Sequence, residues 1–134
     1  MEVPDQRSDA RERALNLMYE AHSKSIAIDD VIEAQVIAPD ELTDLLVRGT
    51  ARTLERADAL IADKAKGWTL QRMPVLDLAV MRLATFELLE RDDVPTAVVL
   101  AEAVALAKRY STDDSGRFVN GVLAAIAAEV RAAE

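Results

Sequence analysis

The sequence predicts an all-α protein. Good helix formers, namely Ala, Leu, Glu, Arg and Lys, dominate the 134 residues, and only four Gly and four Pro interrupt them. No block of the sequence favours strands. The apolar content of 51% is enough for one domain with a real core, or for two small bundles that share a helix.

The shared helix is expected at residues 74–89. In this range the only charges are Asp77, Arg82 and Glu87, and their regular spacing points them in three directions around a helix. A helix that is apolar nearly all round is normally buried all round, so we expect the other helices to pack against this one. A membrane span is the alternative, but the apolar run is short for one and carries three charges.

Composition narrows the classes of function. The chain has no Cys and a single His, which excludes disulfides, Cys-ligated zinc and a His cluster for a metal, and no cofactor is expected. The N-terminus has no apolar signal-peptide core, so we expect a cytoplasmic protein. The net charge of −8 argues against nonspecific nucleic-acid binding over the whole surface, although local basic patches remain open.

The first helix is expected to begin at Asp9, an N-cap residue followed by Glu12, and to end near Ser23, with residues 1–8 frayed. Three arginines, Arg7, Arg11 and Arg13, cluster at its start. Cations at this end of a helix oppose its dipole. The cluster is interpreted either as a solvated helix end with local counter-charges or as a contact with an anion or RNA.

Two more helical segments are expected before Gly67. A short amphipathic turn covers residues 28–34, and apolar spacing then predicts one long helix over 40–66, about 40 Å in length, which Gly67 ends. Gly49 lies inside the long helix, where it costs roughly 1 kcal/mol relative to Ala unless something approaches closely. We expect the first helix to pack there.

Residues 68–73 connect this helix to the central one and are expected to form one helical turn. Trp68 is interpreted as a structural plug between two bundles, with a base-stacking surface as the alternative. Residues 96–108 hold one acidic charge, Glu102, in an apolar run and predict a second buried helix. Because an unpaired buried charge is costly, we expect an ion pair between Glu102 and Arg82. No complementary acid, base or nucleophile clusters with Glu102, so catalysis is not expected.

The last helix is expected after residues 111–114, which all favour N-caps, with Phe118 on its apolar stripe and Gly121 at a close helix crossing. Positive charge gathers beside aromatic rings at this end of the chain (Lys108, Arg109, Tyr110, Arg117 and Phe118). Such an arrangement can neutralise and stack on single-stranded RNA. An ordinary charged helix end is the alternative.

Several stretches of the sequence, taken together, resemble the NusB family of bacterial transcription antitermination factors. They follow the family's order between about residues 7 and 126. The most specific are Phe-Val-Asn-Gly-Val-Leu at 118–123 and the central helix with Asp77 and Arg82. The others are Ala-Arg-Glu-Arg-Ala at 10–14 with Tyr19, Trp-x-Leu-x-Arg-Met at 68–73, Phe-Glu-Leu-Leu at 86–89, Val-Pro at 94–95 and Glu-Ala-Val-x-Leu-Ala-Lys at 102–108.

The resemblance implies one family domain over residues 1–134. Its fold would be two packed helical bundles of about six to seven helices, with subdomains at 1–67 and 68–134. It implies a recognition protein and not an enzyme. The family pairs with NusE, a small-subunit ribosomal protein, and the pair binds the boxA sequence of nascent ribosomal RNA within an RNA polymerase antitermination complex. Some members form homodimers.

The resemblance also implies RNA contacts. The matching positions are Arg7, Arg11, Arg13, Arg117 and Phe118. The family's Arg run is broken here by Ser8 and Asp9. Each lost phosphate contact lowers the salt dependence of single-strand binding by roughly 0.7 in log–log slope. We therefore expect the chain alone to bind boxA RNA weakly, and its pair with NusE to bind it strongly.

Partner-binding positions of the family fall on Tyr19, Asp77 and Asp114. Tyr19 and Asp77 are expected on the NusE-facing surface, and Asp114 at a helix start where charge tunes affinity. A divergent partner-binding or homodimeric module with weakened RNA binding is the alternative function. An RNA-binding domain of a ribosomal RNA methyltransferase is a third, but the chain has no Gly-rich nucleotide-binding segment for methyl transfer.

Overall fold

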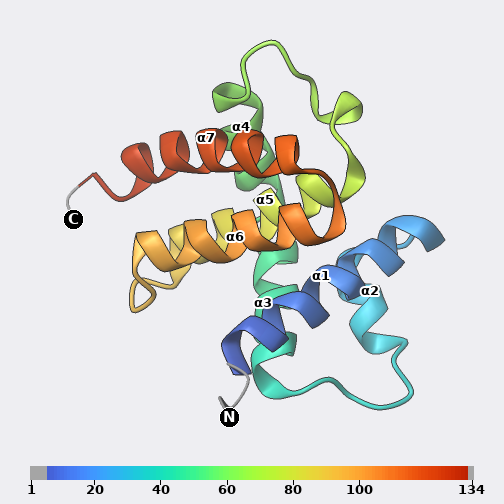
Figure 1. Cartoon of the computed structure of the whole chain (residues 1–134). Helices are drawn as coiled ribbons and strands as arrows, with labels where there is room; N and C mark the ends of the chain where they lie inside the picture. Colours follow the sequence, from blue (N-terminus) through green and yellow to red (C-terminus); the bar gives the residue numbers. More distant parts are fainter. Residues whose placement is uncertain (1–5, 133–134) are drawn as a thin grey trace.

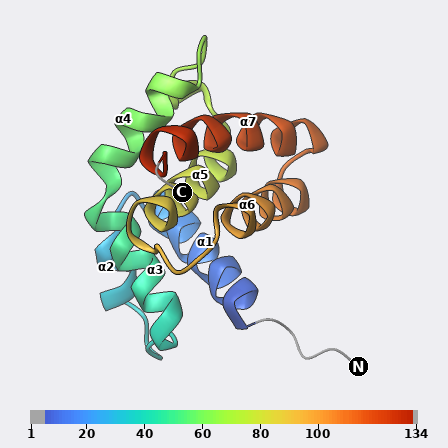
Figure 2. The same ribbon diagram turned by 90° about the vertical axis from the view of Figure 1, so that its left-hand side faces the viewer.

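The computed structural model describes residues 6–132 (Figure 1; Figure 2), and in this range it contains only helices and no strand. The α-helices are α1 (Gln6–Lys24), α2 (Ile28–Glu33), α3 (Glu41–Arg52), α4 (Leu54–Lys64), α5 (Val75–Glu90), α6 (Thr96–Tyr110) and α7 (Asp113–Val130), and a 3-10 turn, η1, spans Leu70–Arg72. The all-α class is confirmed. None of these helices is both long and apolar enough to cross a membrane.

Helix α5 is the central helix that the sequence predicts. It packs against α1, α3, α4, α6 and α7, and both views show it running through the middle of the molecule (Figure 1; Figure 2). Burial on all sides is the arrangement that hides a helix without a wide polar face. Buried side chains from both halves of the chain form one hydrophobic cluster around it. The division into subdomains at residues 67 and 68 stays a prediction.

Helix α1 begins at Gln6, earlier than expected, so Asp9 lies in its first turn and is not the N-cap. Of the segment expected to be frayed, residues 6–8 are helical and residues 1–5 lie outside the described range. The single turn expected at 68–73 is confirmed as η1. The N-cap expected before the last helix is confirmed at Thr112, whose hydroxyl accepts a hydrogen bond of 3.1 Å from the Ser115 amide.

The single long helix expected over 40–66 is wrong, because the chain breaks at Thr53 into α3 and α4. The Thr53 hydroxyl donates a hydrogen bond of 2.8 Å to the Gly49 carbonyl, and the Thr50 hydroxyl donates one of 2.7 Å to the Leu46 carbonyl. Threonines that bond back to the preceding turn bend helices. The apolar spacing continues through such a bend, so the sequence pattern does not reveal it.

Gly49 does allow a close approach, but by a different helix from the one expected. A Cβ atom at this position would lie 2.2 Å from Cε1 and Cζ of Phe86 in α5. The first helix is therefore not the reason for this glycine. The close crossing expected at Gly121 is also wrong, because no atom lies within 4 Å of a Cβ built there.

Helix α6 is buried on one side only, which limits the second buried helix expected at 96–108 to one face. Its buried residues are Val99, Ala103, Leu106 and Ala107, whereas Val98 is exposed. The opposite face consists mainly of small alanines, whose exposure costs little.

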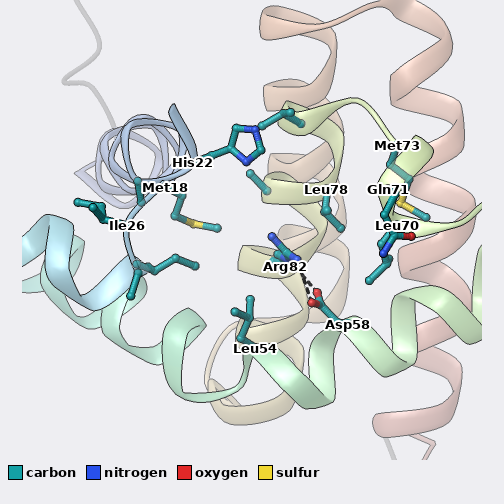
Figure 3. Close-up of a pocket in the computed structure, with 15 residues that line it drawn as sticks. Met18, His22, Ile26, Leu54, Asp58, Leu70, Gln71, Met73, Leu78 and Arg82 are labelled. Atoms are coloured by element: carbon teal, nitrogen blue, oxygen red, sulfur yellow. Dashed lines mark hydrogen bonds and ion pairs between the residues drawn. The ribbon is translucent and has the colours of Figure 1, made fainter. Parts of the chain in front are cut away.

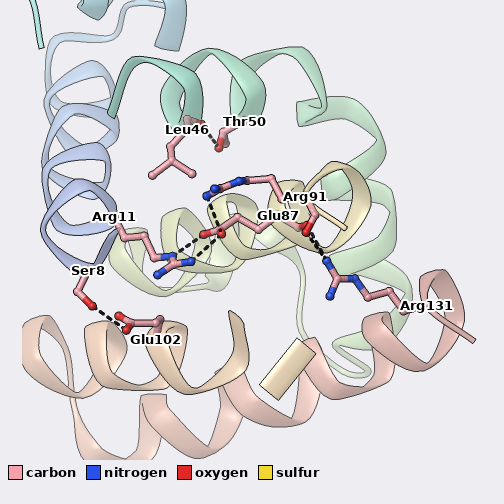
Figure 4. A network of polar contacts seen from close by, with 8 residues as sticks. All are labelled: Ser8, Arg11, Leu46, Thr50, Glu87, Arg91, Glu102 and Arg131. Carbon is pink, nitrogen blue, oxygen red and sulfur yellow. Dashed lines mark hydrogen bonds and ion pairs between the residues drawn. The ribbon is translucent and has the colours of Figure 1, made fainter. Parts of the chain in front are cut away.

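The expected ion pair between Arg82 and Glu102 is wrong. The Arg82 Nε and Nη2 atoms lie 2.7 and 2.8 Å from the two carboxylate oxygens of Asp58 in α4 (Figure 3). Glu102 instead accepts a hydrogen bond of 2.7 Å from the Ser8 hydroxyl of α1 (Figure 4). The two charges therefore serve different helix contacts, because Arg82 points from α5 toward α4 and Glu102 points from α6 toward α1.

Candidate nucleic-acid interface

The three arginines at the start of α1 have different surroundings. Arg7 is exposed. Arg13 is half-exposed, and its Nη2 atom lies 2.7 Å from Oδ1 of Asp40, the N-cap residue of α3. Arg11 is buried, with only 3% of its surface exposed. The cluster that the sequence suggests is therefore not one surface.

Arg11 forms an internal ion pair with Glu87 of α5, the central-helix charge for which the sequence offered no partner. Its Nε and Nη2 atoms donate to the two Glu87 carboxylate oxygens at 2.7 and 2.9 Å (Figure 4). Glu87 is 1% exposed and also lies 3.3 Å from Nη1 of Arg91. A phosphate cannot reach Arg11 in this arrangement, so the expected RNA contact is corrected to a structural role.

Asp40 holds Arg13 in place at the start of α3. Hydrogen bonds from the Thr43 hydroxyl (2.6 Å) and the Thr43 backbone amide (3.2 Å), together with the charge of Arg13, hold the pKa of Asp40 below its usual range despite some desolvation. The carboxylate is thus ionised and engaged at neutral pH, and it offsets the charge of Arg13.

The start of α7 carries a different kind of surface. Phe118 packs against Trp68, with ring centroids 5.9 Å apart and ring planes inclined by 59°. Trp68 is 50% exposed, so the structural plug expected from the sequence is wrong and the base-stacking alternative gains support. Arg117 is highly exposed and pairs with Asp114 one turn earlier.

Basic side chains surround this pair of rings. Lys64, Lys66 and Arg117 share one concavity with Trp68 and Phe118, and Lys108 and Arg117 share the next. Ion pairs with Glu129 and Asp63 raise the pKa of Lys64. We call Lys66, Trp68, Lys108, Arg117 and Phe118 the aromatic–basic surface.

Two of these cations have no local counter-charge. Neither Lys66 nor Lys108 has an ion-pair partner in the described part of the chain, and both are exposed. The sequence patterns predicted no role for Lys66, and they predicted that Trp68 is a structural plug between two bundles. The signal that could have found both is local, because the run from Lys64 to Trp68 places two lysines just before an aromatic residue.

The α1 arginines lie apart from this surface. In both views α6 lies between α1 and α7 (Figure 1; Figure 2). Glu12 fastens α1 to the end of α6, since it accepts hydrogen bonds from the Tyr110 hydroxyl and, at 3.3 Å, from Arg109. The structure therefore does not bring Arg7 and Arg13 together with Arg117 and Phe118.

The three residues expected to face a partner do not share one surface. Asp77 is only 2% exposed, and its assignment to the NusE-facing surface stays a prediction. It lines a pocket of about 200 Å³ together with Asp114, Trp68 and Phe118. Tyr19 is 47% exposed on α1 and does not line that pocket.

A groove of about 480 Å³ opens between the end of α1, α4, η1 and α5. Its apolar lining includes Met18, Ile26, Leu70 and Leu78, with the Arg82–Asp58 ion pair among the lining groups (Figure 3). Tyr19 follows Met18 directly in α1. Tyr19 does not itself line the groove, but exposed aromatic residues and apolar grooves are both typical of protein-binding surfaces.

Comparison with known proteins agrees with this architecture. Residues 8–128 match the profile of the NusB family. The chain is 48% identical over 127 residues to the transcription antitermination protein NusB of Saccharopolyspora erythraea, covering 90% of this chain and 86% of that protein. The structure of T. maritima NusB superposes with a TM-score of 0.82 at 32% identity and covers 96% of this chain and 94% of that one. A crystal structure of antitermination factors NusB and NusE in complex with dsRNA gives a TM-score of 0.74 at 26% identity, covering 90% and 95%.

Proposed function

The chain belongs to the NusB family of transcription antitermination proteins, and from this membership we propose that it pairs with NusE and binds boxA RNA through the aromatic–basic surface. It is an antitermination factor and not an enzyme. The proposed site of action is the cytoplasmic antitermination complex of RNA polymerase on ribosomal RNA transcripts.

One observation supports the RNA surface above all: an exposed tryptophan packs against Phe118 and is flanked by cations without local counter-charges. Stacking on aromatic rings and neutralisation of phosphates are the two interactions that hold single-stranded RNA. Arg117 belongs to the same surface. Arg7, exposed at the start of α1, is a second contact for a longer RNA.

NusE is the proposed partner at the α1 surface, where Tyr19 is exposed and residues at the end of α1 line the apolar groove. The chain carries a net charge of −8 and keeps Arg11 inside, so it offers few cations to phosphate. NusE supplies positive charge that the broken arginine run lacks. RNA affinity then depends on the pair.

The test is fluorescence anisotropy of labelled boxA RNA with the chain alone and with NusE. We expect tight binding only in the presence of NusE. Replacing Lys66 and Phe118 with Ala weakens RNA binding by the pair without loss of NusE binding, whereas Tyr19→Ala weakens NusE binding first. Lys24→Ala, at the exposed end of α1, is the charge-matched control. Equal RNA affinity with and without NusE, or no effect of the Lys66 and Phe118 changes, contradicts the proposal.

A second candidate is a partner-binding or homodimeric module that has lost RNA recognition. It is favoured by Ser8, which is bonded to Glu102, and by the burial of Arg11. Absence of RNA binding even with NusE, at low salt, supports this candidate. Light scattering on the protein eluted from a size-exclusion column then distinguishes a homodimer from a monomer.

A further inference from the structure

The connection between α2 and α3 displays two neighbouring apolar side chains that the described chain leaves uncovered. Val36 is fully exposed and Ile37 is 85% exposed, at a bend of the chain. The other large apolar side chains on the described surface expose only 37% to 50%. Single exposed apolar residues are ordinary, but an adjacent and wholly uncovered pair marks an interaction surface. We call residues 34–40 the Val36–Ile37 loop.

Both ends of this loop are fastened to the helices around it. The Gln35 side-chain amide donates to the Val31 carbonyl at 3.0 Å and to Oε2 of Glu20 in α1 at 3.3 Å. At the other end, Asp40 caps α3 and pairs with Arg13 of α1. The apolar pair is therefore held out on a fixed support, which lowers the entropy lost when a partner binds.

The charge around the loop selects the kind of partner. Residues 20–45 contain seven acidic residues and one lysine, so they carry −6 of the chain's net −8. Asp29, Asp30 and Glu41 are exposed and form no ion pair in the described part of the chain. This charge repels the phosphates of RNA. A second copy of the chain would bring the same acidic face against itself, which is costly. A protein surface with basic residues around an apolar pocket is complementary.

The loop also lies apart from the aromatic–basic surface. In both views the connection between α2 and α3 is at the opposite end of the molecule from α7 (Figure 1; Figure 2). A protein bound at the loop therefore leaves the start of α7 open to RNA.

We propose that the Val36–Ile37 loop docks onto a protein of the RNA polymerase antitermination complex other than NusE, inserting its two apolar side chains into a pocket with a basic rim. Burial of the apolar pair provides affinity, and the surrounding carboxylates orient the encounter. The inference goes beyond the proposed function, because neither pairing with NusE nor binding of boxA RNA requires this contact.

The test uses stalled transcription complexes on a boxA template, purified from the bacterium with their bound proteins and supplied with NusE and labelled chain. We expect the Val36→Ser, Ile37→Ser double variant to be retained about tenfold more weakly than the native chain, because it loses most of the buried apolar area. Retention of the native chain should fall with salt, and less steeply for the Asp29→Asn, Asp30→Asn variant. Val98→Ser, at an exposed valine of α6, is the matched control and should be retained normally.

The double variant should keep the native thermal midpoint and the native affinities for NusE and boxA RNA, because both side chains face water. A photo-reactive benzoylphenylalanine in place of Ile37 should cross-link to a segment of protein rich in Lys and Arg.

Normal retention of the double variant overturns the inference, and so does cross-linking to RNA alone. Weakened binding of NusE or boxA RNA by the double variant also overturns it, because the loop then belongs to those surfaces. A native dimer that dissociates in the double variant, measured by light scattering, assigns the loop to a second copy and overturns it too. If the native chain binds NusE and boxA RNA but is not retained on the complexes, this inference fails while NusE pairing and RNA binding stand.

Discussion

At the scale of single residues, the charge on a helix side chain does not tell which way it points. Arg11 looks like part of a basic arm in the sequence, yet it forms a two-point ion pair with Glu87 inside the core. The pair fixes α1 against α5, and it explains how α5 accommodates a carboxylate among apolar side chains.

Removing Arg11 should therefore destabilise the fold and not act on RNA. We expect Arg11→Ala to lower the free energy of unfolding by about 3–5 kcal/mol, because it leaves Glu87 buried without its main partner. Urea unfolding measures this. Restoration of stability in the Arg11→Met, Glu87→Met double variant supports the cause. A variant of native stability that loses RNA affinity shows that Arg11 serves RNA after all.

The pH dependence of stability should contain a contribution from Asp40. Folding lowers the pKa of Asp40, mainly through the Thr43 hydroxyl, so its charge stabilises the folded state at every pH above the unfolded value of about 3.9. This contribution is lost as the pH falls through the lower folded value. The gap in unfolding free energy between the native chain and Asp40→Asn is expected to be constant near neutral pH and to close in acid. A gap that persists to the lowest pH contradicts the assignment.

At the scale of elements, the contact between α3 and α5 depends on one missing side chain. Phe86 fills the space that a Cβ atom at position 49 would need. This close contact lies just before the break at Thr53. Beyond the break the chain continues as a separate helix, α4, which also packs against α5.

Gly49→Ala is expected to cost about 1–3 kcal/mol through overpacking, although Ala is the better helix former. Phe86→Leu in the same chain should recover part of the loss. Gly121→Ala is the matched control, since it meets no neighbouring atom and should be neutral or slightly stabilising. Thermal unfolding followed by circular dichroism compares the three. Equal effects at positions 49 and 121 show that Phe86 does not limit position 49.

At the scale of the whole molecule, an acidic chain must bind an anionic ligand through a local surface. The net charge of −8 repels RNA at long range, and in the proposed binding mode the exposed Lys66, Lys108 and Arg117 attract it at contact. Under the proposed function, NusE adds phosphate contacts at a separate place, so salt should affect RNA binding by the chain alone and by the pair differently.

We expect log affinity for boxA RNA to fall more steeply with log salt for the pair than for the chain alone, by roughly 0.7 for each added phosphate contact. Lys66→Ala should reduce the slope by roughly 0.7, the value of one phosphate contact, both for the chain alone and for the pair. Lys24→Ala should leave the slope unchanged. Anisotropy titrations across a salt series give the slopes. Parallel slopes for the pair and the chain show that NusE adds no phosphate contact.

The sequence by itself determined the helical class, the buried central helix at α5, the turn at η1, the cap at Thr112 and membership of the NusB family. Each depends on local composition, periodicity or residues adjacent in the chain. Only the tertiary structure decided that Arg11 is internal, that Asp77 faces a pocket and that Trp68 meets Phe118. Helical spacing gives the face of a helix on which a side chain lies, but its partner depends on how distant helices cross. Arg11 and Glu87 are 76 positions apart, and no local pattern records that they meet.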